Sequence, residues 1–256
     1  MLTQEQLKSW EDNGYVRLGR IMSREELAAL QRRIDDIMLG RVLYPGMFFQ
    51  LDSDTGDYGD LWKQPQGYQG PTLNYRKIQD LERDPLFLAY MQHPFFRGLT
   101  RQLVGENVSC FRAMFMNKPA KKGTVLPYHQ DGGSQWELDR EHFITVWTGL
   151  DPATIENGCV QIIPGSHKLG LLSERGHTIT PEQEALHCKE EDSIYLEADA
   201  GECFLLHNYV LHRSGVNTIT QSRRAFSVVY MDAETRSKKT GELFPLIFGQ
   251  GALAPV

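Results

Sequence analysis

The chain has 256 residues, of which 41% are hydrophobic and 23% charged, and its formal net charge is −6. This length and composition suit one globular domain with a substantial core. The acidic balance argues against nucleic acid as a partner, and no apolar run is long enough to span a membrane. The four cysteines show no C-x-x-C spacing, which favours free thiols in a reducing compartment and hence a cytoplasmic protein.

The N-terminal part, over about 1–105, is predicted to be mainly helical. Thr3 can cap a short amphipathic helix that continues to about Asp12. The stretch Ser23-Arg24-Glu25-Glu26 is a capping box and begins a longer helix. Residues 94–104 predict another helix. The first residues are polar and mildly acidic, so neither a signal peptide nor a transit peptide is expected.

Between residues 44 and 75 the periodicity disappears. The segment contains several glycines and three prolines, mixed with the aromatic residues Phe48, Phe49, Tyr58, Trp62 and Tyr68. A long irregular segment inside a compact domain is uncommon unless it is functional. We expect a lid that covers a substrate, although an ordered surface loop held by its aromatic side chains would have the same composition.

After residue 105, short strand patterns alternate with turn signals. They lie at residues 108–117, 126–130, 143–150, 160–163, 202–206, 210–214 and 223–231. Helices followed by many short strands predict a mainly β protein, a barrel or double sheet with flanking α-helices. We therefore expect a single domain over 1–256 with its β core over about 106–232. An excursion rich in Glu and His interrupts this core at 171–192.

A candidate metal site begins at His129-Gln130-Asp131, at the end of one of these strands. Side chains two positions apart on a strand point the same way, so His129 and Asp131 can share a metal ion. His212 can complete a set of two histidines and one carboxylate. That set leaves one side of an octahedral ion open and is diagnostic of non-haem Fe(II) oxygenases.

Other histidines are weaker candidates. His207 competes with His212, but the two residues are five positions apart and would face opposite ways on one strand. His207 is therefore interpreted as a structural residue or as one that contacts the metal ligands without binding the metal itself. His167, at a Pro-Gly-Ser-His turn, could contact a substrate or stabilise the turn. The remaining histidines have no ligand pattern and are expected at the surface: His93, His142, His177 and His187.

Arg223 is predicted to bind the distal carboxylate of a co-substrate, because its planar guanidinium can bind a carboxylate with two parallel hydrogen bonds. On the strand that begins here, Arg223 shares its face with the small residues Ala225 and Ser227, which leave room for a ligand. Arg224 shares the other face with larger apolar residues. The alternative is that both are ordinary surface arginines.

At these residues the chain resembles the phytanoyl-CoA dioxygenase family of Fe(II)/2-oxoglutarate oxygenases. The similarity runs from residue 77 to residue 225 through motifs in a fixed order. They are Lys77-Ile78-Gln79-Asp80, Met114, Asn117-Lys118-Pro119, His129-Gln130-Asp131, Trp147, Glu156-Asn157-Gly158-Cys159, Pro164-Gly165-Ser166-His167, His212-x-Ser214-Gly215-x-Asn217 and Arg223-x-Ala225.

The resemblance implies a double-stranded β-helix, a cupin-like jelly roll. It implies that iron is held by His129, Asp131 and His212, with 2-oxoglutarate and O2 as co-substrates. It further implies a 2-oxoglutarate site built from six residues: Arg223, Lys77, Trp147, Met114, Gln130 and Ser214. Halogenases of this architecture replace the metal carboxylate by a small residue. Because Asp131 is present, hydroxylation is favoured over halogenation.

We therefore expect hydroxylation of a small metabolite or natural-product intermediate, with release of succinate and CO2. The acidic balance does not favour a polyanionic acyl-CoA, although an acyl-CoA hydroxylase remains an alternative. The same oxidation chemistry could also lead to desaturation, cyclisation or epimerisation. An alternative of another class is a cupin-like protein that binds a metal and a ligand without turnover.

Overall fold

The computed structural model describes residues 1–63, 66–141, 143–173 and 177–255. Its α-helices are α1 (Gln4–Asn13), α2 (Arg24–Met38), α3 (Pro85–Met91), α4 (Pro94–Leu103) and α5 (Pro181–His187). Its 3₁₀ helices are η1 (Tyr58–Lys63), η2 (Leu81–Arg83), η3 (Ser134–Trp136), η4 (Ser166–Leu169) and η5 (Glu190–Asp192). Its strands are β1 (Tyr15–Arg20), β2 (Phe49–Leu51), β3 (Tyr75–Ile78), β4 (Val108–Lys118), β5 (Leu126–Gln130), β6 (Phe143–Gly149), β7 (Val160–Ile162), β8 (His177–Thr178), β9 (Ile194–Leu196), β10 (Glu202–Leu206), β11 (His212–Ser214), β12 (Arg223–Asp232) and β13 (Leu246–Phe248).

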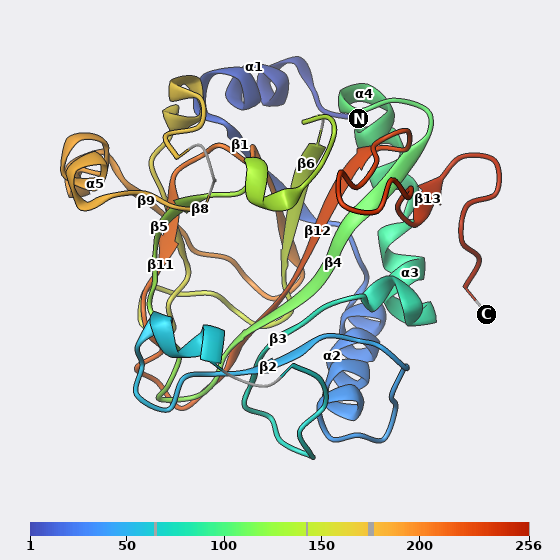
Figure 1. Cartoon of the computed structure of the whole chain (residues 1–256), viewed down its shortest axis with the longest axis horizontal. Helices are drawn as coiled ribbons and strands as arrows, with labels where there is room; N and C mark the ends of the chain where they lie inside the picture. Colours follow the sequence, from blue (N-terminus) through green and yellow to red (C-terminus); the bar gives the residue numbers. More distant parts are fainter. Residues whose placement is uncertain (64–65, 142, 174–176, 256) are drawn as a thin grey trace.

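Two antiparallel sheets face each other in a jelly roll, as expected (Figure 1). The larger sheet has the order β1-β10-β6-β12-β4-β3-β2, and β13 also pairs with β4. The smaller sheet has the order β8-β5-β11-β7-β9. Strands that are distant in the chain become neighbours in this arrangement. The sheets therefore bring residues from both halves of the sequence to the space between them.

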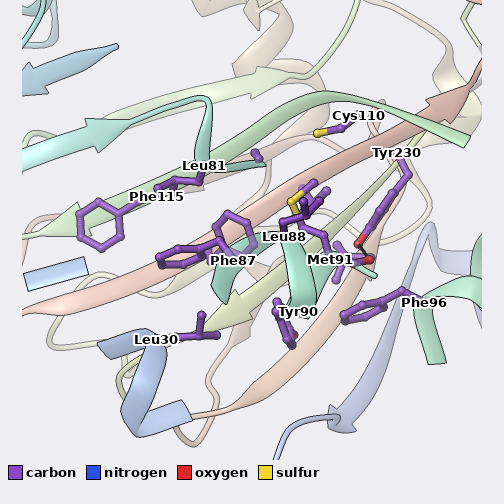
Figure 2. Packing of buried hydrophobic residues seen from close by; sticks show 14 of the residues in the cluster. Leu30, Leu81, Phe87, Leu88, Tyr90, Met91, Phe96, Cys110, Phe115 and Tyr230 are labelled. Carbon is purple, nitrogen blue, oxygen red and sulfur yellow. Dashed lines mark hydrogen bonds between the residues drawn. The ribbon is translucent and has the colours of Figure 1, made fainter. Parts of the chain in front are cut away.

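Helices α2, α3 and α4 cover the face of the large sheet that points away from β5 and β11 (Figure 1). The predicted capping boxes are present, with Thr3 accepting from the Gln6 N–H and Ser23 from the Glu26 N–H. Figure 2 shows the resulting apolar layer, to which Phe87 and Tyr90 of α3 and Tyr230 of the sheet contribute. The rings of Phe87 and Tyr90 contact the ring of Phe226 on β12. Both helices and sheet contribute fully buried aromatic side chains, so this layer is a closed core.

Several elements were not expected. Strand β2 lies inside the segment 44–75 and pairs with β3, so this part of the expected lid is an edge of the large sheet. Strands β8 and β9 and helix α5 lie in the excursion 171–192 or directly after it. These elements have two to seven residues, too few for a periodic pattern. The prediction for His142 concerns a residue outside the described ones. Residues 64–65 of the segment 44–75 and residues 174–176 of the excursion 171–192 also lie outside them.

Strand β3 contains a β-bulge. The register with β2 pairs Gln50 with Lys77 and Leu51 with Tyr75, and it skips Arg76. A bulge of this kind re-aims the side chains on either side of it. Tyr75 and Ile78 both enter the helix-side core, while Arg76 and Lys77, which are consecutive, both line the space between the sheets.

All four cysteines are free thiols, as expected. Within the described part of the chain, no helix is both long and apolar enough to cross a lipid bilayer.

Candidate active site

Two histidines and an aspartate meet at the inner face of the small sheet. His129 of β5 and His212 of β11 are directly paired in the antiparallel register. Asp131 follows β5, and its N–H donates to the Asn208 carbonyl at 2.8 Å. Ligand atoms of the three side chains lie within 4.8 Å of one another. Among the residues that the structure describes, this is the single group of three such donors.

Each histidine is oriented by a backbone carbonyl two residues earlier in the chain. Nδ1 of His129 is 2.9 Å from the Pro127 oxygen, and Nδ1 of His212 is 2.9 Å from the Val210 oxygen. Because a carbonyl only accepts, each Nδ1 carries the proton and each Nε2 keeps its lone pair. Burial and the nearby His212 hold the pKa of His129 well below its ordinary value, so His129 stays in the neutral form that binds metals. Two such nitrogens and one carboxylate suit Fe(II).

The competing histidines lie elsewhere. His207 follows β10 and is not on the strand of His212. Its ring centroid is 5.5 Å from that of Trp10 and 4.9 Å from that of His167. Nε2 of His167 is 3.2 Å from the Glu11 carbonyl oxygen. These contacts attach helix α1 to the β core, and neither histidine belongs to the residues that line the cavity.

A cavity of about 310 Å³ lies between the two sheets, next to the three metal-binding candidates. This volume is at the lower end of the range for ligand sites. Five of the six residues that the resemblance assigns to 2-oxoglutarate line it: Lys77, Met114, Trp147, Ser214 and Arg223. The sheets thus bring together residues from β3, β4, β6, β11 and β12.

Arg223 is buried at the end of β12, with 4% of its surface exposed. One guanidinium nitrogen, Nη2, donates to the Gly158 carbonyl at 2.9 Å. Gly158 has φ +76°, and a Cβ there would lie 2.7 Å from the Gly215 oxygen, so this approach needs glycine. Burial lowers the pKa of Arg223 to about 10, which still leaves it charged at neutral pH.

Two buried donors at this end of the cavity have no acceptor. Within the described residues, Arg223 Nε and Trp147 Nε1 make no hydrogen bond. The guanidinium carbon lies 6.0 Å from the Trp147 ring centroid. Buried polar groups without a partner reduce stability and need a physical explanation. A carboxylate of a bound co-substrate would satisfy donors of this kind, so these residues fit 2-oxoglutarate.

Arg224 takes the opposite face of β12. It forms a two-point ion pair with Asp151, at 2.7 and 2.8 Å, and a further one with Asp35 of α2 at 2.6 Å. Its charge is therefore compensated by the protein, and it connects the large sheet to a helix. Neither arginine is an ordinary surface residue.

Gln130 is the exception among the expected 2-oxoglutarate contacts. It lies between His129 and Asp131 on the strand, so its side chain points away from theirs. Its amide donates to the Gly170 and Tyr209 carbonyls and accepts from the Leu172 N–H. The structure therefore places the Gln130 side chain outside the cavity, where it holds the neighbouring loops in place.

The expectation that His177 lies at the surface is wrong. His177 is partly buried and lines the cavity, and its ring centroid is 5.0 Å from that of His129. Nε2 of His177 contacts the hydroxyl of Tyr58 in the segment 44–75. Phe48, Gln50 and Leu61 of that segment also line the cavity, so the segment forms part of the cavity wall.

Four basic residues of the cavity were also missed: Arg76, Arg112, Lys118 and Arg213. A signal existed for two of them. On β4, Arg112 lies two positions before Met114, and Lys118 lies four positions after it. Because side chains at even spacing on a strand point the same way, both share the face of Met114. For Arg76 the alternation would have predicted the wrong face because of the bulge.

Comparison with known proteins decides the family. Residues 10–225 match the model of the family described as phytanoyl-CoA dioxygenase (PhyH). The chain belongs to the PhyH family. It is 27% identical over 262 residues to a phytanoyl-CoA dioxygenase of Arabidopsis thaliana, covering 91% of this chain and 90% of that protein. It is 24% identical to the peroxisomal phytanoyl-CoA dioxygenase of Rattus norvegicus, covering 92% and 70%.

Solved structures show the same fold. EctD from S. alaskensis, in a crystal structure with 2-oxoglutarate and 5-hydroxyectoine, superposes with a TM-score of 0.74 at 19% identity, covering 99% of this chain and 86% of EctD. The epimerase SnoN, in complex with Fe³⁺, α-ketoglutarate and nogalamycin RO, gives a TM-score of 0.67 at 18% identity, covering 93% and 87%. Together with the PhyH family membership and the donor set, this identifies an Fe(II)- and 2-oxoglutarate-dependent oxygenase.

Proposed function

We propose that this PhyH-family chain hydroxylates an unactivated C–H bond of a small metabolite or natural-product intermediate. The observation that carries the proposal is the pair of unsatisfied buried donors, Arg223 Nε and Trp147 Nε1, in the cavity that also contains the three metal-binding candidates. A protein that merely stores a metal has no need for such donors. A site that binds a co-substrate with a distal carboxylate needs them.

The proposed roles follow from the geometry. His129, Asp131 and His212 hold iron through Nε2 and carboxylate atoms. Arg223 binds the distal carboxylate of 2-oxoglutarate, with Trp147 as a second donor. The other contacts to 2-oxoglutarate are Lys77, Met114 and Ser214, which line the same cavity. Iron and 2-oxoglutarate, when bound, supply the oxidation of the C–H bond by O2, with release of succinate and CO2.

The chain itself orients the reactants and excludes water. The contact between Tyr58 and His177 joins the segment 44–75 to the small sheet above the metal-binding residues. We propose that this segment is a lid, which keeps water from a reactive centre.

Assays of succinate release from 2-oxoglutarate with Fe(II) and O2 test the proposal. Asp131→Ala should reduce coupled turnover below detection, because iron loses a ligand and its charge compensation. His207→Ala, the matched histidine site outside the cavity, should retain it. Absence of succinate from wild-type protein with bound iron would support the cupin-like protein without turnover instead.

The mass of the product distinguishes the remaining alternatives. Hydroxylation adds one oxygen atom to the substrate, while desaturation or cyclisation removes two hydrogen atoms. Epimerisation leaves the mass unchanged. We expect the added oxygen; an unchanged mass, or the loss of two hydrogen atoms, would reject hydroxylation but retain the oxygenase.

A further inference from the structure

The cavity wall is strongly basic, although the chain as a whole is acidic. The described residues that line it include one carboxylate, Asp131, and six basic side chains. The basic residues are Arg76, Lys77, Arg112, Lys118, Arg213 and Arg223. One of them is neutralised by the protein, since Arg213 pairs with Glu190 at 2.9 Å. The net charge of −6 therefore says nothing about the charge of the site.

Iron and 2-oxoglutarate together neutralise only part of the positive charge of the cavity wall. A divalent iron and the Asp131 carboxylate together carry one positive charge, and the two carboxylates of 2-oxoglutarate reduce this to one negative charge. Arg223 balances that charge. Lys118 donates to the Thr124 carbonyl at 2.7 Å, and burial lowers its pKa well below the ordinary value.

Lys77 is only partly protonated at neutral pH, because burial and the neighbouring Arg112 and Arg76 lower its pKa to about 7. The buried Asp52 is near enough to Arg76 to raise its pKa and offsets part of its charge. Of the carboxylates that the structure describes, Arg112 faces only Asp131, which is already counted with the iron.

Arg112 is held in place but makes no polar contact. Its guanidinium carbon is 4.7 Å from the Phe111 ring centroid and 4.9 Å from the Trp136 ring centroid. Among the described residues, Arg112 forms no hydrogen bond or ion pair. Aromatic rings fix a guanidinium by cation–π contact and leave its planar edge free for hydrogen bonds. That edge is available to a ligand in the cavity.

Arg112 and Arg223 lie at opposite ends of the cavity. Arg223 is the register partner of Lys118 on β4, and Arg112 is on the same strand and the same face. Six residues of extended strand span about 20 Å. The carboxylate that Arg223 binds is therefore out of reach of Arg112. Arg112 and Asp131 line the same cavity, and Asp131 is near enough to raise the pKa of Arg112 against the lowering caused by burial.

Arg76 supplies a second charge from the lid side. Its Nη1 donates to the Gln50 side chain at 3.1 Å, and its guanidinium is 5.8 Å from the Tyr58 ring centroid. Neither partner is ionised at neutral pH. Arg76 therefore adds to the attraction for an anion in the cavity, while the buried Asp52, which raises the pKa of Arg76, offsets part of its charge.

We propose that the substrate of this oxygenase is a small organic anion whose terminal oxyanion, a carboxylate or a phosphate, is bound by Arg112, with attraction from Arg76. The proposal rests on the proposed function, because it places the carbon skeleton of that anion beside His129, Asp131 and His212. A cavity of about 310 Å³ suits a small body and would leave the nucleotide of an acyl-CoA outside.

Binding of three probes with one alkyl chain tests the proposal directly: hexanoate, hexyl phosphate and the neutral hexanamide. Calorimetric titrations use metal-free protein and, under nitrogen, protein loaded with Fe(II) and 2-oxoglutarate. The loaded protein should bind one of the two anions at least tenfold more tightly than the amide, as expected for a charge-assisted contact. Hexanoate and hexyl phosphate together reveal which oxyanion is preferred.

Variants assign the preference to Arg112. Arg112→Gln should abolish the preference for the anion, and Arg112→Lys should retain part of it, because charge remains but the planar fork is lost. Arg97→Gln is the matched control, since Arg97 also lies over an aromatic ring, 5.3 Å from the Phe248 centroid, but outside the cavity. Equal binding of anion and amide, including no measurable binding of either, would overturn the proposal. So would an anion preference that survives in Arg112→Gln.

The anion site and the oxygenase activity can be rejected independently of each other. Succinate release that acid and amide stimulate equally would retain the oxygenase and dismiss the anion site. An anion preference that depends on Arg112 in metal-free protein, without any succinate release, would retain the anion site and dismiss the oxygenase.

Discussion

The two faces of the large sheet treat polar groups in opposite ways. On the helix side the sheet packs aromatic and aliphatic side chains into a closed core, and Arg224 is fully paired with Asp151 and Asp35. On the cavity side Arg112 has no ion-pair partner among the described residues, and Arg223 Nε and Trp147 Nε1 have no acceptor there. On the helix face the polar groups are paired within the protein, whereas the cavity face keeps donors that have no acceptor among the described residues.

The largest expected effect is on the helix face. Phe226 is fully buried, and its ring centroid is 4.8 Å from that of Phe87. Phe226→Ala should lower the free energy of unfolding by about 3–5 kcal/mol, because it leaves a cavity in the core. Ser227→Ala, on the cavity face, should change it by about 1 kcal/mol or less. Urea titrations measure both, and similar losses would contradict the distinction between the faces.

Removal of the paired arginine should also reduce stability. Arg224→Ala leaves Asp151, whose side chain is 7% exposed, without its ion-pair partner. We expect a loss of about 3 kcal/mol, because an unpaired buried carboxylate is costly. The Michaelis constant for 2-oxoglutarate should not change. A raised Michaelis constant with unchanged stability would show that Arg224, not its neighbour, binds the co-substrate.

Removal of Arg223, which has no ion-pair partner among the described residues, should weaken binding of 2-oxoglutarate without reducing stability. Arg223→Gln should raise the Michaelis constant for 2-oxoglutarate by roughly 10- to 100-fold, the loss expected for a hydrogen bond to a charged group. The melting temperature of the ligand-free protein should stay the same or rise, since burial already disfavours the charged form of Arg223. A clear drop in the melting temperature would mean that Arg223 is mainly structural.

The smallest effect concerns pH. Burial and the nearby Arg112 and Arg76 lower the pKa of Lys77 from 10.5 to about 7. Unfolded Lys77 keeps its proton up to about 10.5, so between pH 7 and 10.5 the unfolded state binds more protons than the folded state. The free energy of unfolding of ligand-free protein should therefore rise with pH in this window, by at most about 1.4 kcal/mol per unit from this group.

Lys77→Met should remove that contribution. Urea titrations of both proteins at pH 7 and pH 9 isolate it as the difference between the two slopes. Equal slopes would mean that Lys77 is solvated in the folded protein. Below pH 7 both states carry the proton, and the difference should vanish.

Much of the β core could be predicted because its strands are long enough to alternate. On β12, Arg223 and Ser227 point into the cavity while Phe226 enters the core, as the pattern indicates. The motif around His129 and Asp131 was equally informative, since two positions on one strand already fix a shared direction. These features depend on local sequence alone.

The features that were missed depend on tertiary contacts. His177 lies on a strand of two residues with φ +73°, and it reaches the cavity only because β8 pairs with β5. A two-residue strand has no pattern to detect. The side chain of Gln130 was assigned to 2-oxoglutarate by family resemblance, whereas strand alternation points it away. At that position elementary geometry was the better predictor of where the side chain lies.

The bulge in β3 places one additional cation, Arg76, in the cavity wall. Without Arg76, the sequence Tyr75-Lys77-Ile78 would alternate regularly between core, cavity and core, and each of these three residues would keep the face that it has now. One cation can thus be inserted or deleted as a unit, without repacking the core beneath it. The extra residue in β3 thus adds a cation to the cavity wall while Tyr75 and Ile78 both stay in the core.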